Sequence, residues 1–193
     1  AYTEDDLGQL KVEVLAQRLR DANGEIAVDA HCARFEGDTA SKLLEGVDIV
    51  LDATDSLQAR LDIDRATYAA KLPWVMGAAV GTSGQWAAFD EARREGCYHC
   101  LMRELDSSEN QGCAELGILG PVVGLVALHQ SLLVIRYLVG AALPFGDLHI
   151  LDAWTGENRQ LGLAVCQDCV LCQEPSTQQS ISPASAESAG HAR

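Results

Sequence analysis

Four cysteines form two pairs with the spacing of metal ligands. Cys97 and Cys100 make one Cys-x-x-Cys pair, and Cys169 and Cys172 make the other. Each pair puts two thiolates on one tight turn, which suits half of a tetrahedral Zn²⁺ site, and two such halves complete a closed structural site. The 68 residues from 101 to 168 separate the pairs, so the metal would join two distant parts of a domain. Cys166 could instead pair with Cys169, and the spacing leaves that alternative open.

Two aspartates lie where a strand-like run leaves the predicted sheet. Asp52 ends an apolar run, and Asp55 follows after Ala-Thr. The carboxyl ends of parallel strands form the ligand crevice of an open α/β sheet, and a carboxylate there can hold Mg²⁺ on the phosphates of a nucleotide. Asp is also a common helix N-cap residue, and from the residues alone a cap at the start of the next helix is the better interpretation of Asp55.

Three further side chains combine a chemical role with an ordinary alternative. Lys11 could reach a phosphate, although a solvated surface lysine is the simpler interpretation. Cys113 lies in a polar stretch, where a thiol of lowered pKa could act as a nucleophile or sulfur carrier, and an inert loop cysteine explains it equally well. Arg60 is most simply a partner for nearby acids such as Asp62 or Asp64.

Hydrophobic periodicity and turn residues predict the elements that would position these side chains. The expected helices run from residue 5 to a stop at Asn23-Gly24 and over residues 39–45, 56–71 and 121–139. The expected strands cover residues 25–30, 47–52, 73–80, 85–89, 148–153 and 158–163. The alternation in the first part implies βαβ crossovers and a parallel sheet, and the later hairpin-like pattern implies antiparallel strands. We therefore predict an α/β fold with a mixed sheet.

Two segments of the chain are expected to lack regular structure. Residues 91–119 are polar with little periodicity and are interpreted as a long crossing loop, with His99 as a loop histidine. Long loops in compact domains are often functional. Residues 173–193 are rich in Ser, Gln, Ala and Pro, so we expect a disordered tail after an ordered domain of residues 1–172.

Composition narrows the class of protein. The 193 residues suffice for one sizeable domain, and the net charge of −14 disfavours nucleic acid and anionic membrane as partners, because both reward basic patches. The apolar segment 121–145 could be a membrane span, but its polar residues and glycines favour a buried core helix. Seven cysteines without a signal-peptide pattern favour a reducing compartment, so we expect a cytoplasmic protein.

The order of the motifs resembles that of the ThiF/MoeB/HesA family, relatives of the ubiquitin-activating enzymes. The resemblance covers residues 1–172 and rests on Gly-Gln-Leu-Lys, Leu-Asp-Ala-Thr-Asp, Cys-Tyr-His-Cys, Cys113 with Gly-Ile-Leu-Gly-Pro, Leu-Asp and Cys-Val-Leu-Cys. It implies a Rossmann-like fold and an enzyme that adenylates the C-terminal glycine of a ubiquitin-like sulfur-carrier protein with ATP and Mg²⁺. The products would serve thiamin or molybdopterin sulfur chemistry. It also implies a homodimer.

The resemblance assigns roles residue by residue. It places Lys11, Asp55 and Ser56 at the nucleotide, with Asp55 serving Mg-ATP and the adenylate, and Cys113 in sulfur transfer. Cys97, Cys100, Cys169 and Cys172 match the structural zinc ligands, and the distance from Asp152 to the second pair favours this set over Cys166 and Cys169.

The sequence also departs from the family pattern. Ser56 and Asp64 stand where Asn is usual, and Leu133 stands where Glu is usual. The chain starts at Ala1 and lacks the glycine-rich nucleotide loop, so we expect a missing preceding βα unit and a chain that does not adenylate alone. Two alternatives are a non-catalytic zinc-stabilised module that binds a ubiquitin-like carrier and a protein whose cysteines are redox centres.

Overall fold

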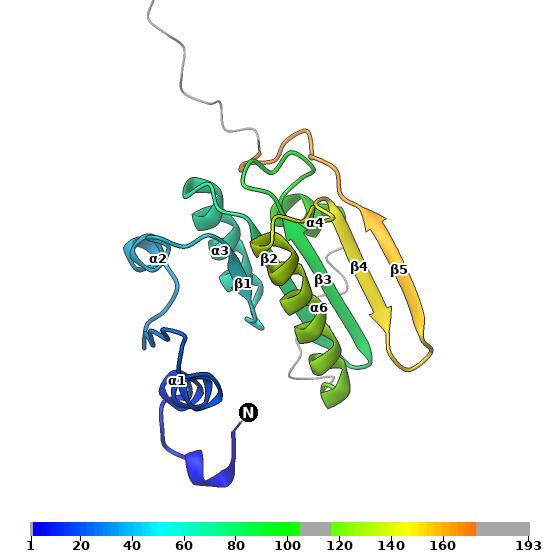
Figure 1. Cartoon of the computed structure of the whole chain (residues 1–193). Coiled ribbons are helices and arrows are strands. Elements are labelled where there is room, and N and C mark those ends of the chain that lie inside the picture. The colour runs from blue at the N-terminus through cyan, green and yellow to red at the C-terminus, as the bar shows by residue number, and fades with distance from the viewer. Residues whose placement is uncertain (1, 105–116, 173–193) are drawn as a thin grey trace, which may run out of the picture.

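The structure is a computed structural model that describes residues 2–104 and 117–172. It confirms the predicted α/β fold and mixed sheet, and among the described residues the sheet has five strands in the order β1-β2-β3-β4-β5 (Figure 1). β1 and β2 are parallel, and the three remaining neighbour pairs are antiparallel. The strands are β1 (Val50–Asp52), β2 (Trp74–Val80), β3 (Ser83–Phe89), β4 (Asp147–Asp152) and β5 (Glu157–Gly162).

Helices pack on both faces of the sheet, and three further helices precede β1 in the sequence. They are the 3-10 helix η1 (Glu4–Asp6) and the α-helices α1 (Lys11–Ala22), α2 (Gly37–Leu43), α3 (Leu57–Ala69), α4 (Tyr98–Glu104) and α6 (Gly120–Leu138). The predicted stop at Asn23 is the C-cap of α1, but the helix begins at Lys11 instead of residue 5. The expected loop 91–119 contains α4, so His99 lies on a helix.

The core consists of two apolar layers, one on each face of the sheet. Successive strand residues point to opposite faces, so Trp74 and Met76 pack with Ile63, Phe89 and Tyr98 on the side of α3 and α4. Val75, Trp86 and Ala88 pack on the other side against Val126 and Leu133 of α6. β1 and β2 are therefore held between helices, which is where parallel strands are normally found.

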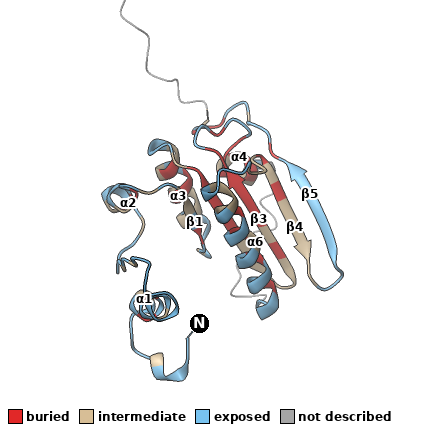
Figure 2. Cartoon of the chain, in the orientation of Figure 1, coloured by how far each residue is buried: buried red, intermediate tan, exposed pale blue. Residues whose placement is uncertain are grey.

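α6 is buried on one face only. By length and composition it could cross a membrane, which is weak evidence because core helices of other proteins pass the same test. Only 22% of its residues are buried, and Figure 2 shows much of the helix exposed. The prediction of a helix over residues 121–139 is confirmed, while the expectation that it is a buried core helix holds for one face alone.

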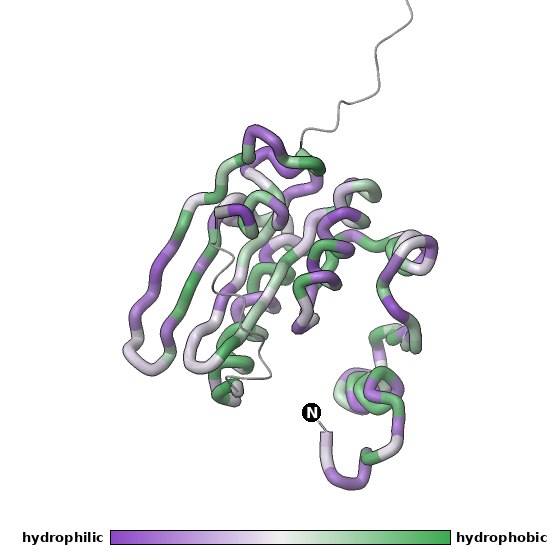
Figure 3. The backbone as a smooth tube through the Cα atoms, turned by 180° about the vertical axis from the view of Figure 1, so that it is seen from behind, coloured by the Kyte–Doolittle hydropathy of each residue, from purple (hydrophilic) through white to green (hydrophobic). Residues whose placement is uncertain are grey.

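Residues 2–46, which we call the N-terminal arm, lie to one side of the sheet, with α1 well away from it (Figures 1 and 3), while Phe35 packs against the core layer on the side of α3. Figure 3 shows hydrophobic and hydrophilic residues alternating along α1, as its periodicity predicts. The prediction of a strand over residues 25–30 is wrong, because this segment has no strand assignment. A strand exists only by pairing with a neighbour, and within the described residues β1 pairs with β2 alone.

Candidate functional sites

The two Cys-x-x-Cys pairs meet in space beside the sheet. Cys97 and Cys100 lie at the start of α4, and Cys169 and Cys172 lie in the segment that follows β5. The Sγ atom of Cys97 is 3.6 Å from that of Cys100 and 3.4 Å from that of Cys169, and Cys100 and Cys172 are 3.8 Å apart. Four sulfurs around a tetrahedral Zn²⁺ with Zn–S bonds of about 2.3 Å lie about 3.8 Å apart. The donor set and its spacing fit a closed tetrahedral metal site.

Cys166 lies beside this cluster without belonging to it. The four sulfurs of Cys97, Cys100, Cys169 and Cys172 all lie within 4.8 Å of one another. Cys166 instead directs its backbone N–H to the sulfur of Cys100 at 3.3 Å, and its own Sγ lies 3.6 Å from the carbonyl oxygen of Cys100. The geometry therefore favours the Cys169–Cys172 pair and gives Cys166 a supporting position.

The clustered thiols differ in acidity. Burial disfavours the thiolate of Cys100, but hydrogen bonds from the backbone of Cys166 and Cys97 outweigh it and lower the pKa of Cys100 to about 7. Burial raises the pKa of Cys172 to about 12. Burial and then the charge of Asp64 raise the pKa of Cys97 above its usual range. A divalent cation would displace these protons, because metals bind thiolates and not thiols.

A buried polar network supports the cluster from α3. The carboxylate of Asp64 accepts hydrogen bonds from Arg93 Nε and from the backbone N–H of Tyr98, both at 3.0 Å. The other partner is His99, whose Nδ1 lies 3.0 Å from the same carboxylate. Asp64 and Arg93 have 0% exposed side chains, and a buried ion pair of this kind depends on its additional hydrogen bonds. The network therefore fixes the start of α4, which contains Cys100 and directly follows Cys97.

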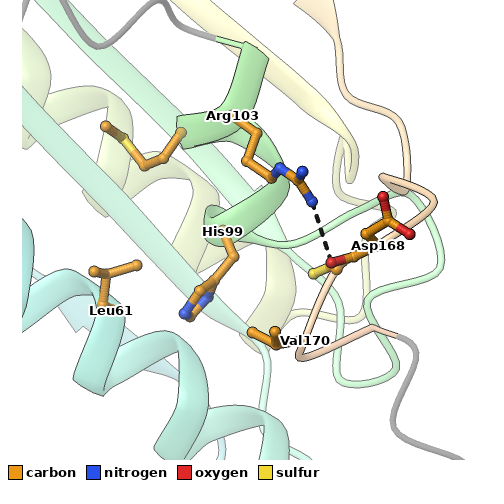
Figure 4. Close-up of a pocket in the computed structure, with 7 residues that line it drawn as sticks. Leu61, His99, Arg103, Asp168 and Val170 are labelled. Carbon is orange, nitrogen blue, oxygen red and sulfur yellow. Dashed lines mark hydrogen bonds between the residues drawn. The ribbon is translucent and has the colours of Figure 1, made fainter.

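A small cavity opens next to this network. Its volume is about 250 Å³, and His99, Arg103, Asp168, Cys169 and apolar side chains line it. Figure 4 shows the guanidinium of Arg103 reaching across to the carbonyl oxygen of Asp168 at 3.1 Å. This contact joins α4 directly to the segment that bears the second cysteine pair.

The second candidate site lies at the carboxyl end of β1. Asp52 is buried, and its Oδ1 accepts a hydrogen bond from the backbone N–H of Thr54 at 2.7 Å. Burial raises the pKa of Asp52, while Thr54 and then Arg60 oppose the change. Asp55 is exposed and has no hydrogen bond or ion pair with any described residue. The alternative role of Asp55 as the helix cap is wrong, because Ser56 is the N-cap of α3 and its Oγ accepts from the N–H of Ala59 at 3.1 Å.

Arg60 binds the strand end and not the acids proposed for it. Its Nη2 donates to the carbonyl oxygen of Thr54 at 2.7 Å and to that of Gly77 at 3.3 Å. Its Nε lies 3.5 Å from Oδ2 of Asp52. The interpretation of Arg60 as a partner for Asp62 or Asp64 is therefore wrong. Spacing on the helix suggested those acids, whereas the contact with Asp52 depends on how α3 packs on the sheet.

The remaining predicted residues do not gather at this strand end. Lys11 is exposed on α1, in the N-terminal arm, and the structure does not bring it to Asp55. Cys113 lies outside the described residues. Sequence reasoning missed Gln130, a buried residue on α6 whose Nε2 donates to the carbonyl oxygen of Asp52 at 2.6 Å. Its signal was an amide inside a mostly apolar helix.

Comparison with known proteins gives a consistent result. A family model described as the ThiF family matches residues 1–170. The sulfur carrier protein ThiS adenylyltransferase of Escherichia coli is 32% identical over 171 residues, which cover 89% of this chain and 68% of that protein. The molybdopterin-synthase adenylyltransferase of Salmonella typhimurium is 31% identical over 172 residues, covering 89% of this chain and 69% of that protein.

Solved structures show the same fold. The crystal structure of E. coli MccB with ATP matches with a TM-score of 0.68 and 18% identity, over 89% of this chain. This chain spans 52% of the length of that MccB chain. At this identity the likeness supports the fold alone.

Proposed function

Because this chain belongs to the ThiF family, we propose that it is the larger part of an enzyme that adenylates the C-terminal glycine of a ubiquitin-like sulfur-carrier protein. The names of the relatives support the proposal, since they are adenylyltransferases for sulfur carriers and for molybdopterin synthase. The observation that carries it is the exposed carboxylate of Asp55 at the carboxyl end of β1, where open α/β sheets bind ligands.

The proposed reaction couples a carboxylate to AMP. An oxygen of the carrier's C-terminal carboxylate attacks the α-phosphorus of ATP, the bond to the β-phosphate breaks, and pyrophosphate leaves. Mg²⁺ would neutralise charge on the phosphates, and Asp55 is the residue proposed to hold it. Ser56 would lie beside the nucleotide while its hydroxyl keeps the first turn of α3 in place. Lys11 is proposed to bind the phosphates once the N-terminal arm approaches the strand end.

We also propose that the four clustered cysteines hold a structural Zn²⁺. Bound zinc would make the four thiolates inert, which argues against a redox role for them. Free thiols in a metal-binding arrangement also suit a reducing compartment such as the cytoplasm. Cys113 is proposed as a sulfur-transfer residue solely from its place in the family pattern.

Pyrophosphate exchange with ATP and candidate carriers tests the function. The assay uses this chain and a form extended upstream of Ala1 by a strand and glycine-rich loop, since the sequence itself contains no such loop. We expect exchange in the extended form and its loss in Asp55→Ala. Absence of pyrophosphate exchange in both this chain and the extended form would contradict the proposal.

A second candidate function is a non-catalytic module that captures a carrier protein. The separation of α1, which begins at Lys11, from β1, which Asp55 follows, favours it (Figure 1), because the proposed phosphate site uses both residues. Zinc binding and carrier capture without any exchange in the extended form would support this alternative.

A further inference from the structure

Gln130 ties α6 to the ends of two strands. Its side chain is 4% exposed, and its Nε2 donates to the carbonyl oxygen of Asp52 at 2.6 Å and approaches that of Val75 at 3.4 Å. The nearby buried residues Val126 and Leu133 of α6 belong to the apolar core layer on this face of the sheet. The amide of Gln130 therefore binds the strand backbone by hydrogen bonds, since packing alone would be satisfied by Leu or Val at this position.

Gly77 on β2 leaves the space for this contact. A β-carbon at Gly77 would collide with the amide carbon, oxygen and nitrogen of Gln130. The amide thus lies flat against bare backbone between β1 and β2. Any larger residue at position 77 would push it away from the carbonyl oxygen of Asp52.

Arg60 holds the same strand end from the opposite face of the sheet. It donates to the carbonyl oxygens of Thr54 at 2.7 Å and Gly77 at 3.3 Å. Gln130 on α6 and Arg60 on α3 therefore bind the backbone on both sides of the turn that leads to Asp55. The carboxylate of Asp55 is exposed and makes no hydrogen bond or ion pair with the described residues, so its position depends on this backbone.

We propose that Gln130 is a positioning residue which, opposite Arg60, fixes the turn from Asp52 to Thr54 and so places the Asp55 carboxylate for the nucleotide. The inference rests on the proposed function for its catalytic consequence. Its structural part, that Gln130 restrains this turn, stands without that function. A shift of about 1 Å in a reacting group can lower a rate by about a hundredfold.

Gln130→Met tests the proposal, because it keeps the length of the side chain and removes the N–H donor. In the form that exchanges pyrophosphate, we expect kcat to fall about ten- to a hundredfold with little change in KM for ATP. Hydrogen exchange at the amides of residues 53–56 should become faster, while the zinc content stays the same. Ser131→Ala is the matched control, since Ser131 lies next on α6 and its hydroxyl donates to the Ala127 carbonyl oxygen within the same helix.

A double variant separates positioning from packing. Gly77→Ala should lower the rate of pyrophosphate exchange, because the added β-carbon displaces the Gln130 amide. Adding Gln130→Ala to this variant removes the collision. If Gln130 only fills volume, Gly77→Ala with Gln130→Ala recovers activity, and this recovery would overturn the proposal. If Gln130 positions the turn, the double variant stays as low as Gln130→Ala.

The hydrogen-exchange measurement decides the inference even if no form exchanges pyrophosphate. Unchanged protection of residues 53–56 in Gln130→Met would overturn it whatever the activity. Faster amide exchange there, with no pyrophosphate exchange in the extended form, would support the restraint and contradict the proposed function instead.

Discussion

The hydroxyl of Ser56 determines what Asp55 can do. Because Ser56 caps α3, the carboxylate of Asp55 is not needed to bind the helix N-terminus. Its neighbour Asp52 is buried and bonded to Thr54, so the two aspartates at one strand end have different environments. A buried carboxylate shapes the turn, and an exposed one remains accessible to a ligand.

Asp55→Asn should therefore change activity without changing stability. We expect pyrophosphate exchange to fall at least about a hundredfold, because the variant loses the charge that would hold Mg²⁺. The melting temperature should stay within about 1 °C, since exposed substitutions away from structural contacts are nearly neutral. Asp48→Asn, at the other end of the β1 segment and also exposed, is the control and should keep full activity. Equal loss in both variants would contradict the assignment.

Cys169→Ser and Cys166→Ser should differ although the residues are three apart. Cys169 belongs to the four-sulfur cluster, so its replacement should reduce bound zinc to well below one per chain and lower the melting temperature by more than about 5 °C. Cys166→Ser should retain its zinc, because its backbone N–H still reaches Cys100. Metal analysis and thermal unfolding check both. Retained zinc in Cys169→Ser would show that another residue completes the site.

At the scale of elements, aromatic stacking joins α6 to the middle of the sheet. The indole of Trp86 on β3 stacks on His129 of α6 with 3.9 Å between centroids, and on His149 of β4 with 5.4 Å. Burial lowers the pKa of His149, Asp147 acts in the opposite direction, and His129 lowers it further. The contact between helix and sheet therefore includes a group that resists protonation.

The stability of the fold should fall on acidification. A histidine whose pKa is lowered in the folded protein takes up its proton more readily in the unfolded chain. The free energy of unfolding therefore decreases as the pH drops below the ordinary histidine pKa of about 6.5. Urea unfolding at pH 7.5 and 5.5 measures this loss. His149→Gln should reduce the difference between the two pH values, whereas His31→Gln, on the exposed N-terminal arm, should not. An unaltered difference in His149→Gln would contradict the explanation.

Local signals were enough to predict most elements but not their partners. The helix after Ser56, the helix that starts near Pro121 and the strand pairs around Gly81 and Gly156 follow from periodicity and turn residues. The wrong prediction of a strand over residues 25–30 has the same cause, because a strand depends on pairing with a neighbour that the local sequence does not reveal.

The sites divide in the same way. Cysteine spacing is a local pattern, and the structure brings the four predicted ligands together. The contacts of Gln130 with Asp52 and of Arg60 with Gly77 join residues that are 78 and 17 positions apart, so only the fold reveals them.

At the scale of the whole molecule, α6 has an apolar stripe that the described chain does not cover. Every third or fourth residue from 125 to 135 forms it, and Leu128 is 69% exposed. Its members are Leu125, Leu128, Leu132 and Ile135, on the side opposite Val122, Val126, Gln130 and Leu133. A large exposed apolar surface usually marks an interface, and this supports the homodimer that the family resemblance implies.

Leu132→Glu should halve the mass of the particle measured by light scattering. A twofold interface brings the same stripe of two copies together, so each substitution would place two buried charges in it. Leu161→Glu on the exposed strand β5 is the control and should leave the mass unchanged. A monomeric unmodified protein would contradict the homodimer and leave another partner or preceding segment to cover α6.

The cluster of four cysteines closes the segment from Cys97 to Cys172 into a loop, which a protease can open. The two cysteine pairs bracket α6, β4 and β5, while residues 105–116 lie between the first pair and α6. A protease cut within residues 105–116 would therefore produce two polypeptides that are held together by the pairing of β3 with β4, by the packing of α6 on the sheet and by the proposed metal. Native mass spectrometry should record them as a single particle, and a chelator should lower the urea concentration at which that particle dissociates, because the strand pairing and the packing of α6 are then its remaining links.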